Sequence, residues 1–111
     1  MSEQETPVLV YTTFPDISSA KRIGGALVER RLAACVNILP GMLSIYRWEG
    51  ALETSEEVVM IIKTSSAAAG DVIREVESLH PYETPAVLKI ETNGGSRSYL
   101  DWIIAMTAPG K

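Results

Sequence analysis

The sequence predicts a single α+β domain whose elements follow one another as βαββαβ, with one more helix near the C-terminal end. The chain has 111 residues, and no linker or internal repeat divides it, so we expect one domain over residues 1–111, with residues 1–6 as an N-terminal tail. Short apolar runs rich in β-branched residues alternate with segments of helical periodicity. Proline and glycine residues mark the boundaries between them.

Residues 8–13 and 17–32 are expected to form the first strand and the first helix. The first segment is a β-branched and aromatic run, and Pro15 ends it. The second segment carries apolar or small side chains at helical spacing. Gly24 and Gly25 inside that helix cost about 1 kcal/mol each relative to alanine, so we expect them to allow close packing of the helix on the sheet.

Residues 34–63 are expected to form a long hairpin. Strand character returns over residues 34–48 and is broken at Pro40–Gly41, a pair that predicts a bulge or bend near a sheet edge. Glu49–Gly50 then turns the chain into the apolar strand at residues 58–63.

The last three elements are a helix, a strand and a helix. Residues 67–79 carry one apolar stripe, and Pro81 disfavours helical geometry at His80, so this helix should end there. Residues 86–91 alternate as a strand with one protected face, and residues 99–106 are expected to form the final helix.

This order is the ferredoxin-like split βαβ plan, in which the first and third strands lie in the middle of the sheet. Both long helices then cover one face of the sheet. The other face would expose apolar side chains. These are either Leu9, Tyr11, Val59 and Ile61, or the strand neighbours of these residues, whose side chains point the opposite way. Apolar patches of that size are uncommon on soluble monomers, so we expect a homo-oligomer.

Composition excludes several classes of protein. The net charge is −4, the sequence pI is about 4.9 and no three basic residues are consecutive, which argues against nucleic-acid binding. No apolar run approaches the ~20 residues of a membrane span, and the acidic start lacks a signal pattern, so we expect a cytoplasmic protein. A single cysteine excludes an internal disulfide and a CxxC site. The sequence has no glycine-rich phosphate loop, nucleophile elbow or HExxH motif, so we expect no enzyme activity.

Seven blocks, in order along the chain, resemble the CutA divalent-cation tolerance family. They are RLAACVN at 31–37, PG at 40–41, SIYRWEG at 44–50, Glu57, MIIKT at 60–64, HPYETP at 80–85 and YLDW at 99–102. The resemblance runs from about Val8 to Trp102. It implies a ferredoxin-like homotrimer with the subunit sheets around a three-fold axis, tolerance of divalent metals, notably copper, and copper binding. It also implies similarity in fold and assembly to PII-type signalling proteins.

His80, Cys35 and Glu83 are the candidate metal ligands, in that order. His80 is the only histidine, and its place fits either a bond to the last helix carbonyls or an imidazole ligand for copper. Cys35 is either a small core side chain or a second donor. The resemblance places the ligand role of His80 on a level with the structural one. Leu79 and Thr12, however, stand where some relatives carry histidine and cysteine, so we expect only weak binding of copper or a similar divalent cation and no obligatory cofactor.

A second set of residues predicts a cleft between subunits. Its members are Tyr46, Trp48, Glu57, Lys63, Tyr82 and Trp102. Glu57 and Lys63 are an even number of residues apart and so share a sheet face. Aromatic residues with a few charges are typical both of a subunit interface and of a small-molecule pocket, in which Lys63 would contact an anion. We therefore expect a trimeric metal-response protein, with a small-molecule-sensing module or a purely structural trimer as the alternatives.

Overall fold

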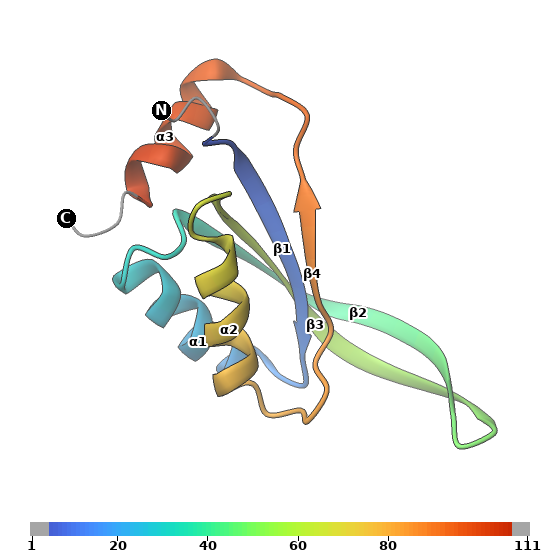
Figure 1. Ribbon diagram of the computed structural model, residues 1–111. Helices are drawn as coiled ribbons and strands as arrows, with labels where there is room; N and C mark the ends of the chain where they lie inside the picture. The colour runs from blue at the N-terminus through green and yellow to red at the C-terminus, as the bar shows by residue number, and fades with distance from the viewer. Residues whose placement is uncertain (1–4, 108–111) are drawn as a thin grey trace.

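The computed structural model describes residues 5–107, which form a four-stranded sheet and three helices (Figure 1). In chain order the elements are β1 (Pro7–Phe14), α1 (Ile17–Glu29), β2 (Cys35–Trp48), β3 (Ala51–Ser65), α2 (Ala69–Leu79), β4 (Val87–Glu91) and α3 (Arg97–Met106). This is the predicted order. The expected tail, residues 1–6, lies outside the described residues except for Glu5 and Thr6, which precede β1.

The sheet has the strand order β2-β3-β1-β4, and every neighbouring pair is antiparallel. The first and third strands are therefore central, and the predicted ferredoxin-like α+β fold is confirmed. β1 lies opposite the second half of β3, with Val10 facing Ile62, while β4 closes the other side of β1. None of the helices in the described part of the chain combines the length and the apolar character needed to cross a membrane.

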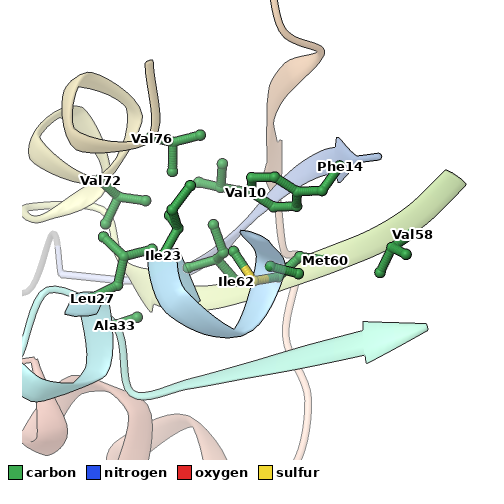
Figure 2. Packing of buried hydrophobic residues seen from close by; sticks show 11 residues of the cluster. Val10, Phe14, Ile23, Leu27, Ala33, Val58, Met60, Ile62, Val72 and Val76 are labelled. Carbon is green, nitrogen blue, oxygen red and sulfur yellow. The ribbon is translucent and has the colours of Figure 1, made fainter. Parts of the chain in front are cut away.

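The hydrophobic core lies between the sheet and the pair α1 and α2, which pack on the same face (Figures 1 and 2). Its largest members are Val10, Phe14, Ile23, Leu27, Met60, Ile62, Val72 and Val76. A Cβ atom on Gly24 would lie 2.9 Å from the Val36 side chain and 2.9 Å from Met60 Sδ, whereas a Cβ on Gly25 would meet nothing within 4 Å. The predicted close packing is thus confirmed at Gly24 and wrong at Gly25.

The first helix ends earlier than its periodicity predicts. Arg31 adopts a left-handed backbone with φ of 61°. The N–H groups of Arg31 and Leu32 then donate to the carbonyls of Val28 and Leu27, as in a Schellman motif. Leu32 still packs on the core, which explains why it continued the apolar pattern beyond the end of α1.

The β2–β3 hairpin extends well beyond the rest of the sheet (Figure 1). β1 pairs with β3 only from Val58 onward, so residues 51–57 pair with β2 alone. We call residues 42–57 the arm. The predicted break lies at its base, where the register shifts between Leu39 and Met42 and Gly41 has φ of 84°. At the tip, Glu49 and Gly50 both have positive φ, as a two-residue hairpin turn requires.

The sheet face opposite α1 and α2, which we call the open face, is rich in apolar side chains. Leu9, Tyr11 and Ile61 are half-buried there. Beside them on β4, Leu88 is 59% exposed and Ile90 is 45% exposed. Because neither long helix covers this face, the apolar area expected from the sequence is present in the single chain.

The third helix covers only one end of the open face. Tyr99 of α3 bonds to Lys63, near the end of β3, and Ile103 is the buried residue of the helix. Val59, which belongs to the set expected on this face, is only 8% exposed.

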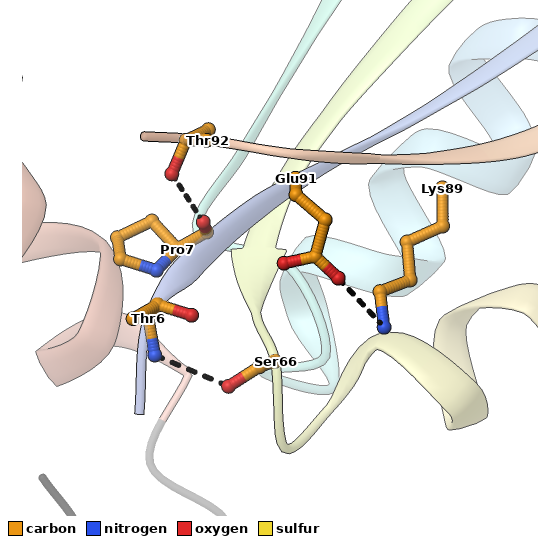
Figure 3. A network of polar contacts seen from close by, with 6 residues as sticks. All are labelled: Thr6, Pro7, Ser66, Lys89, Glu91 and Thr92. Carbon is orange, nitrogen blue, oxygen red and sulfur yellow. Dashed lines mark hydrogen bonds and ion pairs between the residues drawn. The ribbon is translucent and has the colours of Figure 1, made fainter. Parts of the chain in front are cut away.

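Polar contacts fasten the start of β1 to the segments beside it (Figure 3). The Thr6 N–H donates to Ser66 Oγ at 3.1 Å, and Thr92 Oγ1 donates to the Pro7 carbonyl at 2.6 Å. These bonds connect the start of β1 with the chain just after β3 and just after β4, and so hold the end of the sheet on which α3 lies.

Candidate functional site

A groove lies between the arm and the loop at residues 80–86, which connects α2 to β4. Its volume is about 660 Å³. It is lined by Tyr46, Trp48, Glu53, Ser55, Glu57, Tyr82 and Thr84. Alternate residues of a strand share a face, and Tyr46 lies directly opposite Glu53 in the register of the arm. Aromatic rings from β2 and carboxylates from β3 therefore form the same wall of the groove.

Glu57 is held in place at the base of the groove by two hydroxyl groups. Ser44 Oγ donates to its Oε1 at 3.0 Å, and the Tyr82 hydroxyl donates to its Oε2 at 2.8 Å. Burial of Tyr82, together with its bond to Glu57, raises the pKa of the phenol to about 12. Tyr82 consequently remains a protonated donor at neutral pH, and Glu57 keeps a fixed orientation.

His80 positions Tyr82 from behind the groove. The His80 ring is 9% exposed and stacks on Phe14 with a centroid distance of 4.5 Å. Its Nδ1 accepts from the Tyr82 N–H at 3.0 Å, so the proton resides on Nε2, which donates to the Thr13 carbonyl at 2.6 Å. Burial lowers the pKa of His80 and favours the neutral ring.

Both nitrogens of His80 are therefore used inside the protein, and a metal ion would have to displace one of these bonds. The carbonyl that His80 contacts belongs to β1 and not to the end of α2, so the capping role considered from the sequence does not describe it. His80 acts here as a buried link between β1 and the 80–86 loop.

The structure does not bring the three predicted metal ligands together. Cys35 pairs with Lys63 on β3, whereas Thr13, the partner of His80, pairs with Val59. Four residues of β3 correspond to about 13 Å, and Cys35 lies on the open face, away from the His80 ring. Glu83 is exposed on the 80–86 loop. Among residues 5–107 no three His, Cys, Asp or Glu side chains lie close enough to hold a metal ion.

Thr12 and Leu79, the two positions compared with relatives, offer no further ligand. Thr12 is fully buried in β1, and Leu79 is 42% exposed at the end of α2. Leucine has no donor atom, and a threonine hydroxyl is a poor copper ligand.

The six predicted cleft residues divide into two groups. Tyr46, Trp48, Glu57 and Tyr82 line the groove. Lys63 and Trp102 instead lie at the other end of the sheet. Glu57 and Lys63 do share a face of β3, but six residues separate them, or about 20 Å.

Around Lys63 the contacts are aromatic. Its Nζ donates to the Tyr99 hydroxyl at 2.9 Å, which raises the pKa of Lys63, and Tyr99 stacks on Trp102 at 5.6 Å between centroids. Within one chain, therefore, Lys63 does not contribute a positive charge to the groove.

Sequence reasoning missed three lining residues, namely Glu53, Ser55 and Thr84. Glu53 and Ser55 lie two and four residues before Glu57, so the period of a strand identifies them once β3 is known to begin at Ala51. Thr84 belongs to the HPYETP block at residues 80–85, but strand periodicity does not identify it because it lies in a loop.

The chain is similar in sequence and in structure to one group of proteins. Residues 8–106 match the family model described as CutA1 divalent ion tolerance protein. The divalent-cation tolerance protein CutA of Thermus thermophilus is 43% identical over 95 residues, covering 86% of this chain and 92% of that protein. The crystal structure of the divalent ion tolerance protein CutA1 from Ehrlichia chaffeensis has a TM-score of 0.90 at 31% identity, covering 96% of this chain and 99% of that one. The periplasmic divalent cation tolerance protein CutA from Archaeoglobus fulgidus has a TM-score of 0.87 at 39% identity, covering 92% and 99%.

Proposed function

The chain belongs to the CutA1 divalent ion tolerance protein family, and we propose that it acts in the response to divalent metal ions as a cytoplasmic homotrimer. In this role it binds copper or a similar divalent cation weakly and catalyses no reaction. The family description concerns tolerance of ions rather than a reaction, which supports a binding role.

The observation that supports assembly with other copies is the uncovered apolar surface of the single chain. Leu88 and Ile90 are exposed on the open face, and Leu43, Ile45 and Leu52 of the arm are 62%, 66% and 70% exposed. A two-stranded ribbon is marginal in water by itself. Other copies of the chain that cover the open face and hold the arm would bury both surfaces.

Sedimentation or light scattering tests the assembly directly. We expect a single species with about three times the 12.1 kDa mass of the chain at micromolar concentration. A stable species with the mass of one chain at that concentration would contradict the trimer.

Weak metal binding is supported by the separation of Cys35, His80 and Glu83. Since no group of three such donors exists among the described residues of one chain, a site with three protein ligands needs donors from more than one copy. Calorimetric titration with Cu²⁺ should show weak, saturable heat that falls in Cys35→Ser or Glu83→Gln. Glu77→Gln, an exposed carboxylate on α2, is the control. The absence of saturable heat at copper concentrations up to about 1 mM would contradict this mechanism.

The cytoplasmic location is supported by the free, half-buried Cys35. The Archaeoglobus fulgidus relative is named as periplasmic, so the location has to be measured for this chain. Cell fractionation of the untagged protein should place it with cytoplasmic markers, and recovery in an osmotic-shock fraction would contradict this location.

A second candidate function is the sensing of a small molecule, as in PII-type proteins. The observation that favours it is that Tyr46, Trp48, Glu57 and Tyr82 line one groove whose volume is in the range of small-molecule sites. The indole N–H signal of Trp48 gives a direct readout for ligands of this groove.

A further inference from the structure

We infer that the groove between the arm and the 80–86 loop binds an organic cation, namely an ammonium group carried on a small apolar body. This inference rests on the small-molecule function proposed above and specifies the ligand class for that site. It differs from the anion that Lys63 suggests from the sequence, because within one chain Lys63 lies at the other end of the sheet.

The charged side chains that line the groove are all negative. Glu53 and Glu57 contribute two carboxylates, and the described residues that line the groove include no lysine, arginine or histidine. Tyr82 stays protonated and therefore neutral, so the two carboxylates are the charged groups among the described lining residues. An anion would meet two negative groups without a cation to offset them, whereas an ammonium ion would be attracted.

Aromatic rings line the groove beside these carboxylates. Trp48, Tyr46 and Tyr82 contribute three rings to the groove, and Trp48 is 61% exposed while Tyr46 is 44% exposed. A cation that approaches the face of such a ring is attracted by its quadrupole, most strongly with tryptophan. Rings together with carboxylates therefore favour an ammonium group over a neutral ligand of the same shape.

The oxygen atoms and the size of the groove favour an organic cation over a bare metal ion. Each oxygen of Glu57 already accepts a hydrogen bond, from Ser44 and from Tyr82. Divalent cations that prefer oxygen bind six or more oxygen atoms, and the carbon atoms of the aromatic rings cannot serve as ligands. The volume of about 660 Å³ also suits a molecule of several heavy atoms rather than a single ion.

Tyr82 is held in a fixed position by the protein before any ligand binds. His80 accepts the Tyr82 N–H and stacks on Phe14, and the two rings of His80 and Tyr82 are 4.9 Å apart. The back wall of the groove is thereby fixed to the hydrophobic core, so one ring and one carboxylate are oriented before any ligand arrives.

Three probes of one shape test the charge of the ligand. Choline carries a quaternary ammonium, 3,3-dimethyl-1-butanol replaces its nitrogen with carbon, and 3,3-dimethylbutanoate carries a negative charge on the same body. Each is titrated into the full-length ¹⁵N-labelled protein, and the two tryptophan indole N–H signals are followed. Trp102 lies outside the groove and is the internal control.

We expect choline to shift the Trp48 signal and leave that of Trp102 unchanged, with an affinity about tenfold or more above that of the neutral probe. Glu53→Gln and Glu57→Gln should each weaken choline binding about three- to tenfold. Glu56→Gln removes the same charge from a neighbouring position that does not line the groove, and should change the affinity by less than about twofold. A well-dispersed spectrum for each variant shows that it is folded.

The outcomes separate the ligand class from the small-molecule function. If the neutral or anionic probe shifts Trp48 as strongly as choline, the groove binds small molecules but the cation assignment is wrong. If choline shifts Trp102 instead, the location is wrong. If none of the three probes moves Trp48 in a correctly assembled protein, both the cation assignment and small-molecule sensing through this groove are contradicted.

Discussion

His80 connects the hydrophobic core to the 80–86 loop through the chemistry of its imidazole ring. It is the only histidine of the chain, and both ring nitrogens make hydrogen bonds while the ring stacks on Phe14. Imidazole is useful here because one neutral ring both donates and accepts, so a single side chain joins β1 to the 80–86 loop.

The stability of the protein should fall as the solution is made acidic below about pH 6.5. Burial lowers the pKa of His80, so the unfolded chain takes up the proton at a higher pH than the folded one. The contribution of neutral His80 to the free energy of unfolding is complete above the ordinary pKa of histidine. It is lost as the pH falls through the lower pKa that His80 has in the folded protein. Urea unfolding at several pH values should show this loss in the wild type. In His80→Gln the slope near pH 6 should be smaller, and an equal slope in both proteins would show that His80 is not its source.

Two buried threonines on neighbouring strands should respond oppositely to removal of their hydroxyl. Within residues 5–107, Thr12 Oγ1 is buried and has no hydrogen-bond partner, whereas Thr64 Oγ1 donates to the Leu32 carbonyl at 2.6 Å. Thr12→Val should raise the free energy of unfolding by about 1 kcal/mol, and Thr64→Val should lower it by a similar amount. Denaturant titration measures both. A loss of stability in Thr12→Val would mean that its hydroxyl has a partner such as a bound water.

At the scale of residues, the sequence predicts which side chains take part in a site better than it predicts which of them lie side by side. Tyr46, Trp48, Glu57 and Tyr82 line one groove of the single chain, whereas Lys63 and Trp102, predicted for the same inter-subunit cleft, lie outside it in that chain. Strand alternation gives the face of a residue but not its distance along the strand from a site. The use of both His80 nitrogens could not be predicted either, because it depends on a β1 carbonyl 67 residues away.

At the scale of elements, α1 contains adjacent glycines with different roles. Gly24 faces the sheet beside Val36 and Met60, while Gly25 is exposed. The backbone of a helix can approach a strand this closely only at a residue without a side chain. Of the two glycines, only Gly24 faces the strand.

Alanine substitutions at these two glycines should therefore have opposite effects. Gly25→Ala should raise the free energy of unfolding by about 1 kcal/mol, because alanine favours the helix and its Cβ meets open space. Gly24→Ala should lower it by about 1 kcal/mol or more, since the β-branched Val36 has to move. Chemical unfolding followed by circular dichroism measures both. Equal effects of the two substitutions would contradict the packing described for Gly24.

Element order was predictable because each core-facing segment carries its own period, but some boundaries were not. Residues 51–57, Ala-Leu-Glu-Thr-Ser-Glu-Glu, have no apolar alternation, so their strand state comes from pairing with β2 and from the Glu49–Gly50 turn. The end of α1 was likewise set by the backbone of Arg31, which no apolar pattern records.

At the scale of the whole molecule, the open face should control assembly. Leu88 on this face and Leu79 at the end of α2 are both exposed, at 59% and 42%. Leu88→Glu should weaken self-association about tenfold or more, because it places a charge in an apolar contact. Leu79→Glu introduces the same charge away from the open face and should leave the mass unchanged. Sedimentation velocity over a dilution series measures both, and an unchanged mass for Leu88→Glu would place the contact between copies elsewhere.

The arm has a consequence for how ligand and quaternary structure affect each other. Its residues 51–57 pair only with β2, so one wall of the groove is attached to the rest of the sheet at its base alone, whereas the Tyr82 wall is anchored in the core. In the proposed trimer, a neighbouring copy that touches the arm would set the distance between the two walls. Any change that association makes in ligand affinity would then be matched, by thermodynamic reciprocity, by an equal change that the ligand makes in association. Dilution of the protein and release of its ligand would be a single coupled equilibrium.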